Sequence, residues 1–158
     1  ARGRAMQSAR ADGAMAAFQA TQAEIGSSLV DDRVEVAAVN GPTSVVLSGD
    51  ADELRDFVEV LRGRGHKTRR LRVSHAFHSP LMEPMLDEFR TVVANLAYRR
   101  PNIPIVSTVD GSADLSSPDH WVEHVRRTVR FAEGVVKLAE AAELLKEIND
   151  DFRALLRE

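Results

Sequence analysis

A hairpin pattern in the first third of the chain most constrains what it can fold into. Residues 34–39 and 44–47 are two runs rich in valine, and residues 40–43 read Asn-Gly-Pro-Thr between them. Asn-Gly and Gly-Pro pairs favour tight turns, so the two runs are predicted to pair as antiparallel strands. Any fold for this chain must therefore place these strands side by side in one sheet.

The segments on either side of the hairpin each combine one strand pattern with one helix pattern. Residues 13–20 suit a short buried strand, and Thr21 with Glu24 forms a capping-box pattern at the start of a helix. Asp50 caps an amphipathic helix that ends near Gly63, and residues 67–73 suit a fourth strand. The order β-α-β-β-α-β over residues 13–73 predicts an α+β, ferredoxin-like subdomain, with two helices on one face of a four-stranded antiparallel sheet.

The rest of the chain is predicted to fold around this subdomain. Residues 1–12 resemble the end of a core helix, and a helix is expected over residues 82–96. Prolines in residues 101–108 suit the start of a strand, and Ser117-Pro118 opens a further helix that breaks near Arg130. We divide the chain into residues 1–12, the ferredoxin-like subdomain 13–73, a pocket segment with helices and one strand over 74–131, and a C-terminal helix over 132–158.

The C-terminal helix carries an apolar stripe with heptad-like spacing. Its members recur at alternating intervals of three and four residues: Leu138, Ala141, Leu145, Ile148, Phe152 and Leu155. Such a stripe buries itself against another element. The pattern fits either docking on this chain or self-association through a second copy.

Composition excludes several classes of function for this chain of 158 residues. The formal net charge of -3 provides no general basic field for nucleic acid. The absence of cysteine rules out disulfides and thiolate chemistry, and it fits a cytoplasmic setting. No apolar run approaches the roughly 20 residues that span a bilayer, so no membrane partner is expected.

Residues 74–82 read Ser-His-Ala-Phe-His-Ser-Pro-Leu-Met and place two imidazoles around an aromatic ring. This segment resembles the acyltransferase domain of modular type I polyketide synthases, which is related to malonyl-CoA:acyl-carrier-protein transacylases. The resemblance extends over about residues 1–140 and includes residues 2–7, 37–42, 46–50 and 121–135. It implies that residues 74–131 form a partial segment of an α/β-hydrolase-like acyltransferase core.

The resemblance also implies roles for four residues. In the family a serine in a Gly-His-Ser-x-Gly turn attacks a thioester, a histidine acts as general base and an arginine binds the free carboxylate of the extender unit. These roles match His78 as base and Arg2 as carboxylate ligand, while His75 and Phe77 belong to the segment that selects malonyl. The intact domain would transfer malonyl from malonyl-CoA, its substrate, to the phosphopantetheine of an acyl carrier protein, in antibiotic biosynthesis for example. No bound cofactor is implied.

The sequence departs from the family pattern in three places. The Gly-His-Ser-x-Gly turn, the Gly-Gln-Gly stretch of the oxyanion hole and the late Glu-Leu-Gly-Pro segment are all absent from the printed sequence. Ser48, Ser74 and Ser79 suit turns and caps better than a strand-to-helix nucleophile elbow. We therefore expect a fragment that is inactive alone and whose end, after about residue 140, is truncated, fused or engineered. The alternative is a noncatalytic folding or interaction module.

Two other chemistries receive weak support. His120 and His124 have helical i, i+4 spacing, but no glutamate stands between them in the position that zinc proteases use, so no metal site is expected. The basic run over residues 67–72 suits either a solvated strand face or contact with the phosphates of coenzyme A or an acidic carrier protein.

Overall fold

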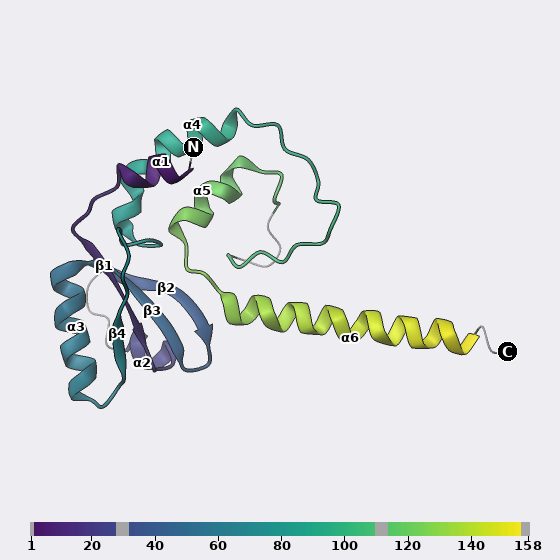
Figure 1. Ribbon diagram of the computed structural model, residues 1–158, viewed down its shortest axis with the longest axis horizontal. Helices are drawn as coiled ribbons and strands as arrows, with labels where there is room; N and C mark the ends of the chain where they lie inside the picture. Colours follow the sequence, from purple (N-terminus) through teal and green to yellow (C-terminus); the bar gives the residue numbers. More distant parts are fainter. Residues whose placement is uncertain (1, 28–31, 110–113, 156–158) are drawn as a thin grey trace.

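The computed structural model describes residues 2–27, 32–109 and 114–155, and in the last helix it describes side chains only up to residue 144 and at residue 146. Figure 1 shows a sheet, a group of short helices beyond one end of it and a C-terminal helix that runs away from both. The strands are β1 (Gly13–Phe18), β2 (Val34–Gly41), β3 (Ser44–Asp50) and β4 (Thr68–Arg70). The helices are α1 (Arg2–Gln7), α2 (Gln22–Gly26), α3 (Ala51–Gly63), the 3-10 helix η1 (Pro80–Met85), α4 (Leu86–Ala94), α5 (Pro118–Arg126) and α6 (Phe131–Leu155).

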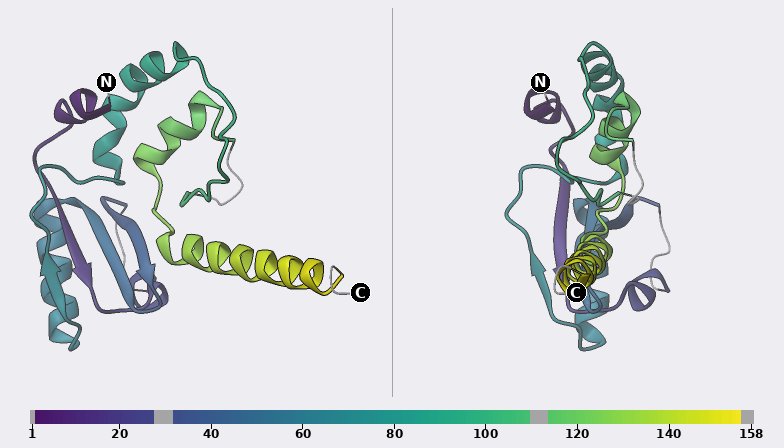
Figure 2. Two further views of the ribbon diagram at one scale, coloured as in Figure 1. Left: turned by 45° about the vertical axis from the view of Figure 1, so that its right-hand side comes forward. Right: turned by 90° about the vertical axis from the view of Figure 1, so that its right-hand side faces the viewer.

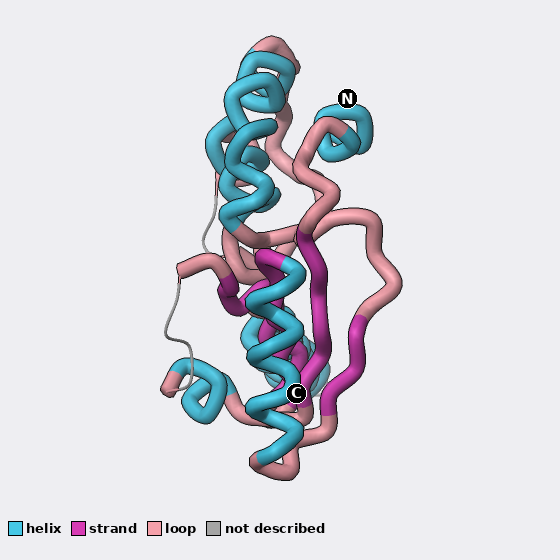
Figure 3. Tube along the Cα trace, turned by 90° about the vertical axis from the view of Figure 1, so that its left-hand side faces the viewer, coloured by secondary structure: helices cyan, strands magenta, loops and turns pink. Residues whose placement is uncertain are grey.

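The four strands form one antiparallel sheet in the order β2-β3-β1-β4. This is the strand order of a ferredoxin-like unit, so the predicted α+β fold is confirmed. Side chains alternate across the sheet, and those on one face pack against α2 and α3; Figure 3 shows α3 in front of the strands. The core on this face consists of Ala14, Ala16, Phe18, Ala20, Ile25, Val34, Val45, Leu47, Leu54 and Leu61.

The local signals around the hairpin are also confirmed. β2 and β3 are joined through Pro42 and Thr43, as the turn chemistry predicts. Asp50 caps α3, because its carboxylate accepts the backbone N–H groups of Asp52 and Glu53 at 3.0 and 3.2 Å. At α2 the Thr21 hydroxyl and the Glu24 carboxylate form both halves of the capping box.

The opposite face of the sheet carries a smaller apolar cluster that contacts the segment of residues 74–82 with its two histidines, the two-histidine segment. Met15, Ala37 and Val46 are buried here, and Phe77 packs against them. Phe77 also contacts a second core, formed by α1, η1, α4 and α5. Figure 2 shows α1, α4 and α5 grouped at one end of the sheet. The two-histidine segment therefore lies where the sheet meets the group of helices.

Three predicted elements differ from the structure. β4 is limited to Thr68–Arg70, shorter than the predicted 67–73. The predicted helix over 82–96 begins as η1 and becomes α-helical only at Leu86, because Pro84 has no N–H to donate. Residues 101–108 form no strand; two prolines lack donors, and Ile103 and Ile105 are exposed with no described strand beside them.

Helix α6 begins directly after residue 130, where the predicted break lies, and contacts the sheet only near its start. Residue Val129 forms an isolated bridge with Ala38, and α6 packs beside β2 before running clear of the body. Of the predicted stripe, Leu138 and Ala141 are exposed, and the side chains of residues 145, 148, 152 and 155 lie outside the described ones. No helix among the described residues is long and apolar enough to cross a membrane.

Gly49 provides a test of the sheet register. It pairs with Val34, and an added Cβ would collide with the Arg33 carbonyl oxygen and lie 2.8 Å from the Val34 Cα, both of them backbone atoms. Gly49→Ala should therefore lower the free energy of unfolding by about 2 kcal/mol. Gly63→Ala, at the end of α3 with no atom within 4 Å, is the matched control and should cause no loss. Urea denaturation measures both; equal stability of Gly49→Ala and wild type would contradict the register.

Candidate active site at His78

The two-histidine segment is a tight, internally bonded turn between β4 and η1. Ser79 is buried, and its hydroxyl donates to the Ala76 carbonyl at 2.7 Å and accepts the Leu81 N–H at 3.3 Å. Ser79 also caps η1, whose Pro80 takes a first-turn position that needs no N–H. These bonds on either side of His78 fix the backbone that carries its imidazole.

His78 has the one positive φ among the described residues other than glycine, at 59°. This left-handed conformation is costly for a residue with a Cβ and persists where the surroundings enforce it. The turn directs the half-buried ring towards the end of α5, where Nδ1 lies 2.9 Å from the Arg127 carbonyl oxygen. Because a carbonyl only accepts, Nδ1 carries the proton and Nε2 keeps its lone pair.

The surroundings of His78 favour its neutral form. Burial lowers the pKa of the imidazole below its ordinary value of 6.5, and the positive charge of Arg2 lowers it further. The bond to the Arg127 carbonyl opposes this shift only in part. At neutral pH, His78 is therefore a neutral imidazole with a free Nε2, which is the form that accepts a proton.

The structure brings Arg2, near the start of the chain, close to His78. Arg2 is exposed at the start of α1, and Ala5 of the same helix packs into the core that α4 and α5 share. The guanidinium lies near enough to lower the pKa of both His78 and His124. An arginine in this position can offer paired donors to a carboxylate beside the imidazole.

Arg2, His78, His120 and His124 form one cluster of side chains. The sequence identified His124 only as half of a weak metal pair. Its ring centroid lies 6.5 Å from that of His78 and 5.9 Å from that of His120. The Nδ1 atom of His124 is buried without a hydrogen-bond partner, and burial lowers its pKa, as do Arg2 and the other two histidines. Among the described residues no group of three or more histidine, aspartate or glutamate side chains is placed to hold a metal ion.

Phe77 and His75 precede His78 in the same turn. Phe77 is half-buried between the two cores, and its ring centroid is 5.9 Å from that of His75. The Nδ1 atom of His75 lies 2.9 Å from the hydroxyl of Ser74, its neighbour in the chain. Phe77 therefore has a packing role in addition to any contact with a substrate.

None of the three serines considered from the sequence lies in a strand-to-helix elbow. Ser48 is buried within β3 and its hydroxyl has no partner, Ser79 is a cap, and Ser74 is exposed in the loop after β4. A nucleophile elbow holds its serine in a strained turn at a helix start, beside a base. Only Ser74 contacts an imidazole, and that imidazole is the adjacent His75.

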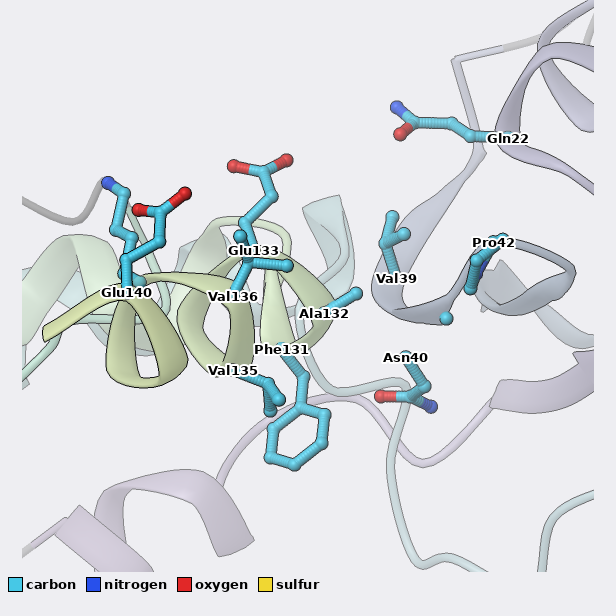
Figure 4. Close-up of a pocket in the computed structure, with 12 residues that line it drawn as sticks. Gln22, Val39, Asn40, Pro42, Phe131, Ala132, Glu133, Val135, Val136 and Glu140 are labelled. Carbon is cyan, nitrogen blue, oxygen red and sulfur yellow. The ribbon is translucent and has the colours of Figure 1, made fainter. Parts of the chain in front are cut away.

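A separate groove of about 690 Å³ lies between the β2–β3 hairpin and the start of α6. Figure 4 shows Val39 on the hairpin and Ala132 on α6 on facing sides of it, with Phe131 and Val135 below. The lining is mainly apolar and includes none of the histidines. The groove is thus distinct from the cluster around His78.

A family comparison places the whole chain rather than its individual residues. The model of the acyl transferase domain matches residues 1–147, which is nearly the whole chain. The chain belongs to the acyl transferase domain family.

The curated relatives of this chain are polyketide synthases. It is 50% identical over 159 aligned residues to polyketide synthase GfsA of Streptomyces halstedii, an alignment that covers 96% of this chain and 2% of that protein. It is 46% identical over 145 residues to mycoketide-CoA synthase of Mycobacterium tuberculosis, covering 90% of this chain and 3% of that protein. The chain thus spans a very small part of each relative.

Solved structures show the same fold. The acyltransferase domain from the second module of the salinomycin polyketide synthase superimposes with a TM-score of 0.84 at 50% identity, covering 88% of this chain and 34% of that one. The malonyl CoA-acyl carrier protein transacylase of Coxiella burnetii gives a TM-score of 0.80 at 27% identity, covering 89% of this chain and 48% of that one. The chain therefore spans about a third of the first of these structures and about half of the second.

The lowered pKa of His78 predicts how stability depends on pH. Its folded pKa lies below 6.5, so the unfolded chain binds the proton first, and this contribution to stability is full above 6.5 and is lost as the pH falls through the folded pKa. The urea midpoint should be lower at about pH 5.5 than at about pH 7.5. His78→Asn, which tolerates the positive φ, should make this dependence shallower; His66→Asn controls for replacing a histidine outside the cluster. An unchanged slope in His78→Asn would contradict the assignment.

Proposed function

We propose that this chain is the base-bearing part of a malonyl-specific polyketide synthase acyltransferase domain. The observation that carries the proposal is the geometry of His78: a left-handed turn directs Nδ1 to the Arg127 carbonyl and leaves Nε2 free. Acyltransferase domains of polyketide synthases act on coenzyme A thioesters and acyl carrier proteins. The serine would come from a segment with a Gly-His-Ser-x-Gly turn, which the printed sequence lacks.

In the proposed reaction His78 moves a proton twice. Nε2 takes the proton of the serine hydroxyl while the oxygen attacks the thioester carbon of malonyl-CoA, and it returns that proton to the coenzyme A sulfur as the carbon–sulfur bond breaks. Nε2 then takes the proton of the phosphopantetheine thiol while the sulfur attacks the carbonyl carbon of the malonyl ester, and it returns that proton to the serine oxygen as the ester bond breaks, which leaves malonyl on the carrier protein as a thioester. Both half-reactions begin with transfer of a proton to Nε2, which requires a neutral imidazole. Burial and Arg2 favour this neutral form.

The neighbouring residues take the substrate-binding roles in this proposal. Arg2 would bind the free carboxylate of malonyl, since a guanidinium pairs with carboxylate through two parallel hydrogen bonds. His75 and Phe77 would line the position of a methyl branch and favour malonyl over its methylated analogue. Exclusion of one methyl group is worth about 1 to 3 kcal/mol, so Phe77 alone would give a modest preference. No bound cofactor takes part.

Labelling with malonyl-CoA tests the proposal. The purified chain alone should acquire no covalent malonyl group, whereas a mixture with a nucleophile-bearing acyltransferase segment should transfer malonyl to a carrier protein. His78→Asn should lower the transfer rate of the mixture about a hundredfold or more. Intact-protein mass spectrometry and a carrier-protein assay give the readouts.

Two outcomes would contradict this function. Stoichiometric labelling of the isolated chain would indicate a nucleophile within it, and Ser74→Ala would then test the serine whose hydroxyl lies 2.9 Å from the His75 Nδ1. Equal transfer by mixtures that contain wild type or His78→Asn would exclude His78 as the base. Ser44→Ala, a change at the hairpin turn outside the cluster, is the control variant.

A second candidate function is helix-mediated self-association, favoured by the exposed apolar residues of α6. Five of its large apolar side chains are 47 to 57% exposed: Phe131, Val135, Val136, Leu138 and Leu144. Apolar surface on this scale commonly marks an interaction site. Here the chain would be a noncatalytic module that pairs through α6.

Light scattering separates this module from the fragment of an enzyme. If pairing is the function, wild type should be a dimer at micromolar concentration, and Leu138→Glu should weaken it at least about tenfold because a buried charge is costly. Lys137→Glu makes a charge change at the adjacent position and should leave the dimer intact. A monomeric wild type would reject this second function.

A further inference from the structure

The segment that joins α5 to α6 is fastened to the edge strand β2. The Thr128 hydroxyl donates to the Val36 carbonyl at 2.7 Å, and the Val129 N–H donates to the Ala37 carbonyl at 2.8 Å. In return the carbonyl of Val129 accepts the Val39 N–H at 2.9 Å. These three bonds fix residues 128 and 129 against the sheet.

Arg126 fastens the same segment from its other end. Its guanidinium forms a two-pronged ion pair with Glu35 of β2, at 2.7 and 2.8 Å, and a third bond at 3.0 Å with Glu83 of η1. The Arg126 side chain is 22% exposed, much less than the arginines of the surface pairs, which are 42 to 63% exposed. A forked, half-buried pair of this kind holds geometry that a solvated pair does not.

Arg127, between these two fastenings, carries the carbonyl that accepts the His78 Nδ1–H. Arg127 ends α5 with φ −76° and ψ 157°, an extended conformation, so its carbonyl leaves the direction of the helix axis. Its own backbone N–H still donates to the Glu123 carbonyl oxygen at 2.8 Å. The carbonyl is therefore directed by what holds residues 126 and 128, and not by a helical hydrogen bond of its own.

Arg126 also contacts η1, the helix that follows His78, the other partner in that bond. Glu83 belongs to η1, which begins two residues after His78, while Arg126 directly precedes Arg127. A single guanidinium thus connects the element that follows the imidazole, the residue before its carbonyl acceptor and the sheet beneath both. Loss of this charge would remove one of the contacts that hold each end of the bond.

We infer that Arg126, paired with Glu35 and Glu83, is a positioning residue that holds the Arg127 carbonyl opposite His78 and so keeps the imidazole in its Nδ1–H tautomer. The meaning of this tautomer for catalysis rests on the proposed function, because only a base needs Nε2 free. The geometric part does not, because it concerns a hydrogen bond within this chain.

Nitrogen NMR of isotope-labelled histidine in the whole chain tests the inference directly, since the two ring nitrogens give distinct signals in each tautomer. His78→Asn identifies the signals of His78. In Arg126→Gln, the population of the Nε2–H tautomer of His78 should rise at least about threefold over wild type. Arg90→Gln removes the pair with Asp119 at the opposite end of α5 and should leave the tautomer unchanged.

The tautomer readout separates positioning from mere stability. Arg126→Gln removes two ion pairs that hold α5, with Glu35 and Glu83, and Arg90→Gln removes one, with Asp119, so Arg90→Gln shows whether weaker anchoring of α5 alone changes the His78 tautomer. If Arg126→Gln does not fold, the milder Glu35→Gln should produce a smaller rise in the same direction. A folded Arg126→Gln or Glu35→Gln with the wild-type tautomer would overturn the inference. Because no acyl transfer is measured, failure of the proposed function would leave this result standing.

Discussion

The hydrogen bond from the His78 Nδ1 to the Arg127 carbonyl is the interaction on which the candidate site depends. It joins residues 49 positions apart in the chain and determines which nitrogen of the imidazole is free. Both partners are held by their own surroundings, His78 by the bonded turn around Ser79 and Arg127 by the fastening of its neighbours to β2. The site is therefore a consequence of how the helices meet the sheet.

The sheet of the ferredoxin-like subdomain supports this arrangement with both of its faces. One face packs against α2 and α3 and supplies the stability of the subdomain. The other face contacts Phe77, which also packs against the core of α1, η1, α4 and α5. The Phe77 ring therefore contacts both the sheet and the helices next to His78. Burial near this junction lowers the pKa of His78 and His124, and the positive charge of Arg2 lowers both further.

Local chemistry predicted most of the subdomain. The hairpin turn, the capping box at Thr21, the Asp50 cap and the order of strands and helices each follow from neighbouring residues, and the structure contains all of them. Predictions failed where an element needs a distant partner: residues 101–108 have strand-like apolar residues, yet no described strand lies beside them to accept their hydrogen bonds. The roles of His78, Arg2, His75 and Phe77 came from the family resemblance and remain proposals.

The sequence by itself determined the ferredoxin-like order of elements and the family to which the chain belongs. Both depend on short motifs of neighbouring residues, which specify them in combination. Only the tertiary structure placed His124 near His78 and assigned the tautomer of His78 through the Arg127 carbonyl. Every residue has the same backbone carbonyl oxygen, so the type of side chain does not indicate which carbonyl accepts the His78 proton. Its direction is decided by contacts such as that of Arg126 with Glu35, residues 91 positions apart, which exist only once the chain has folded.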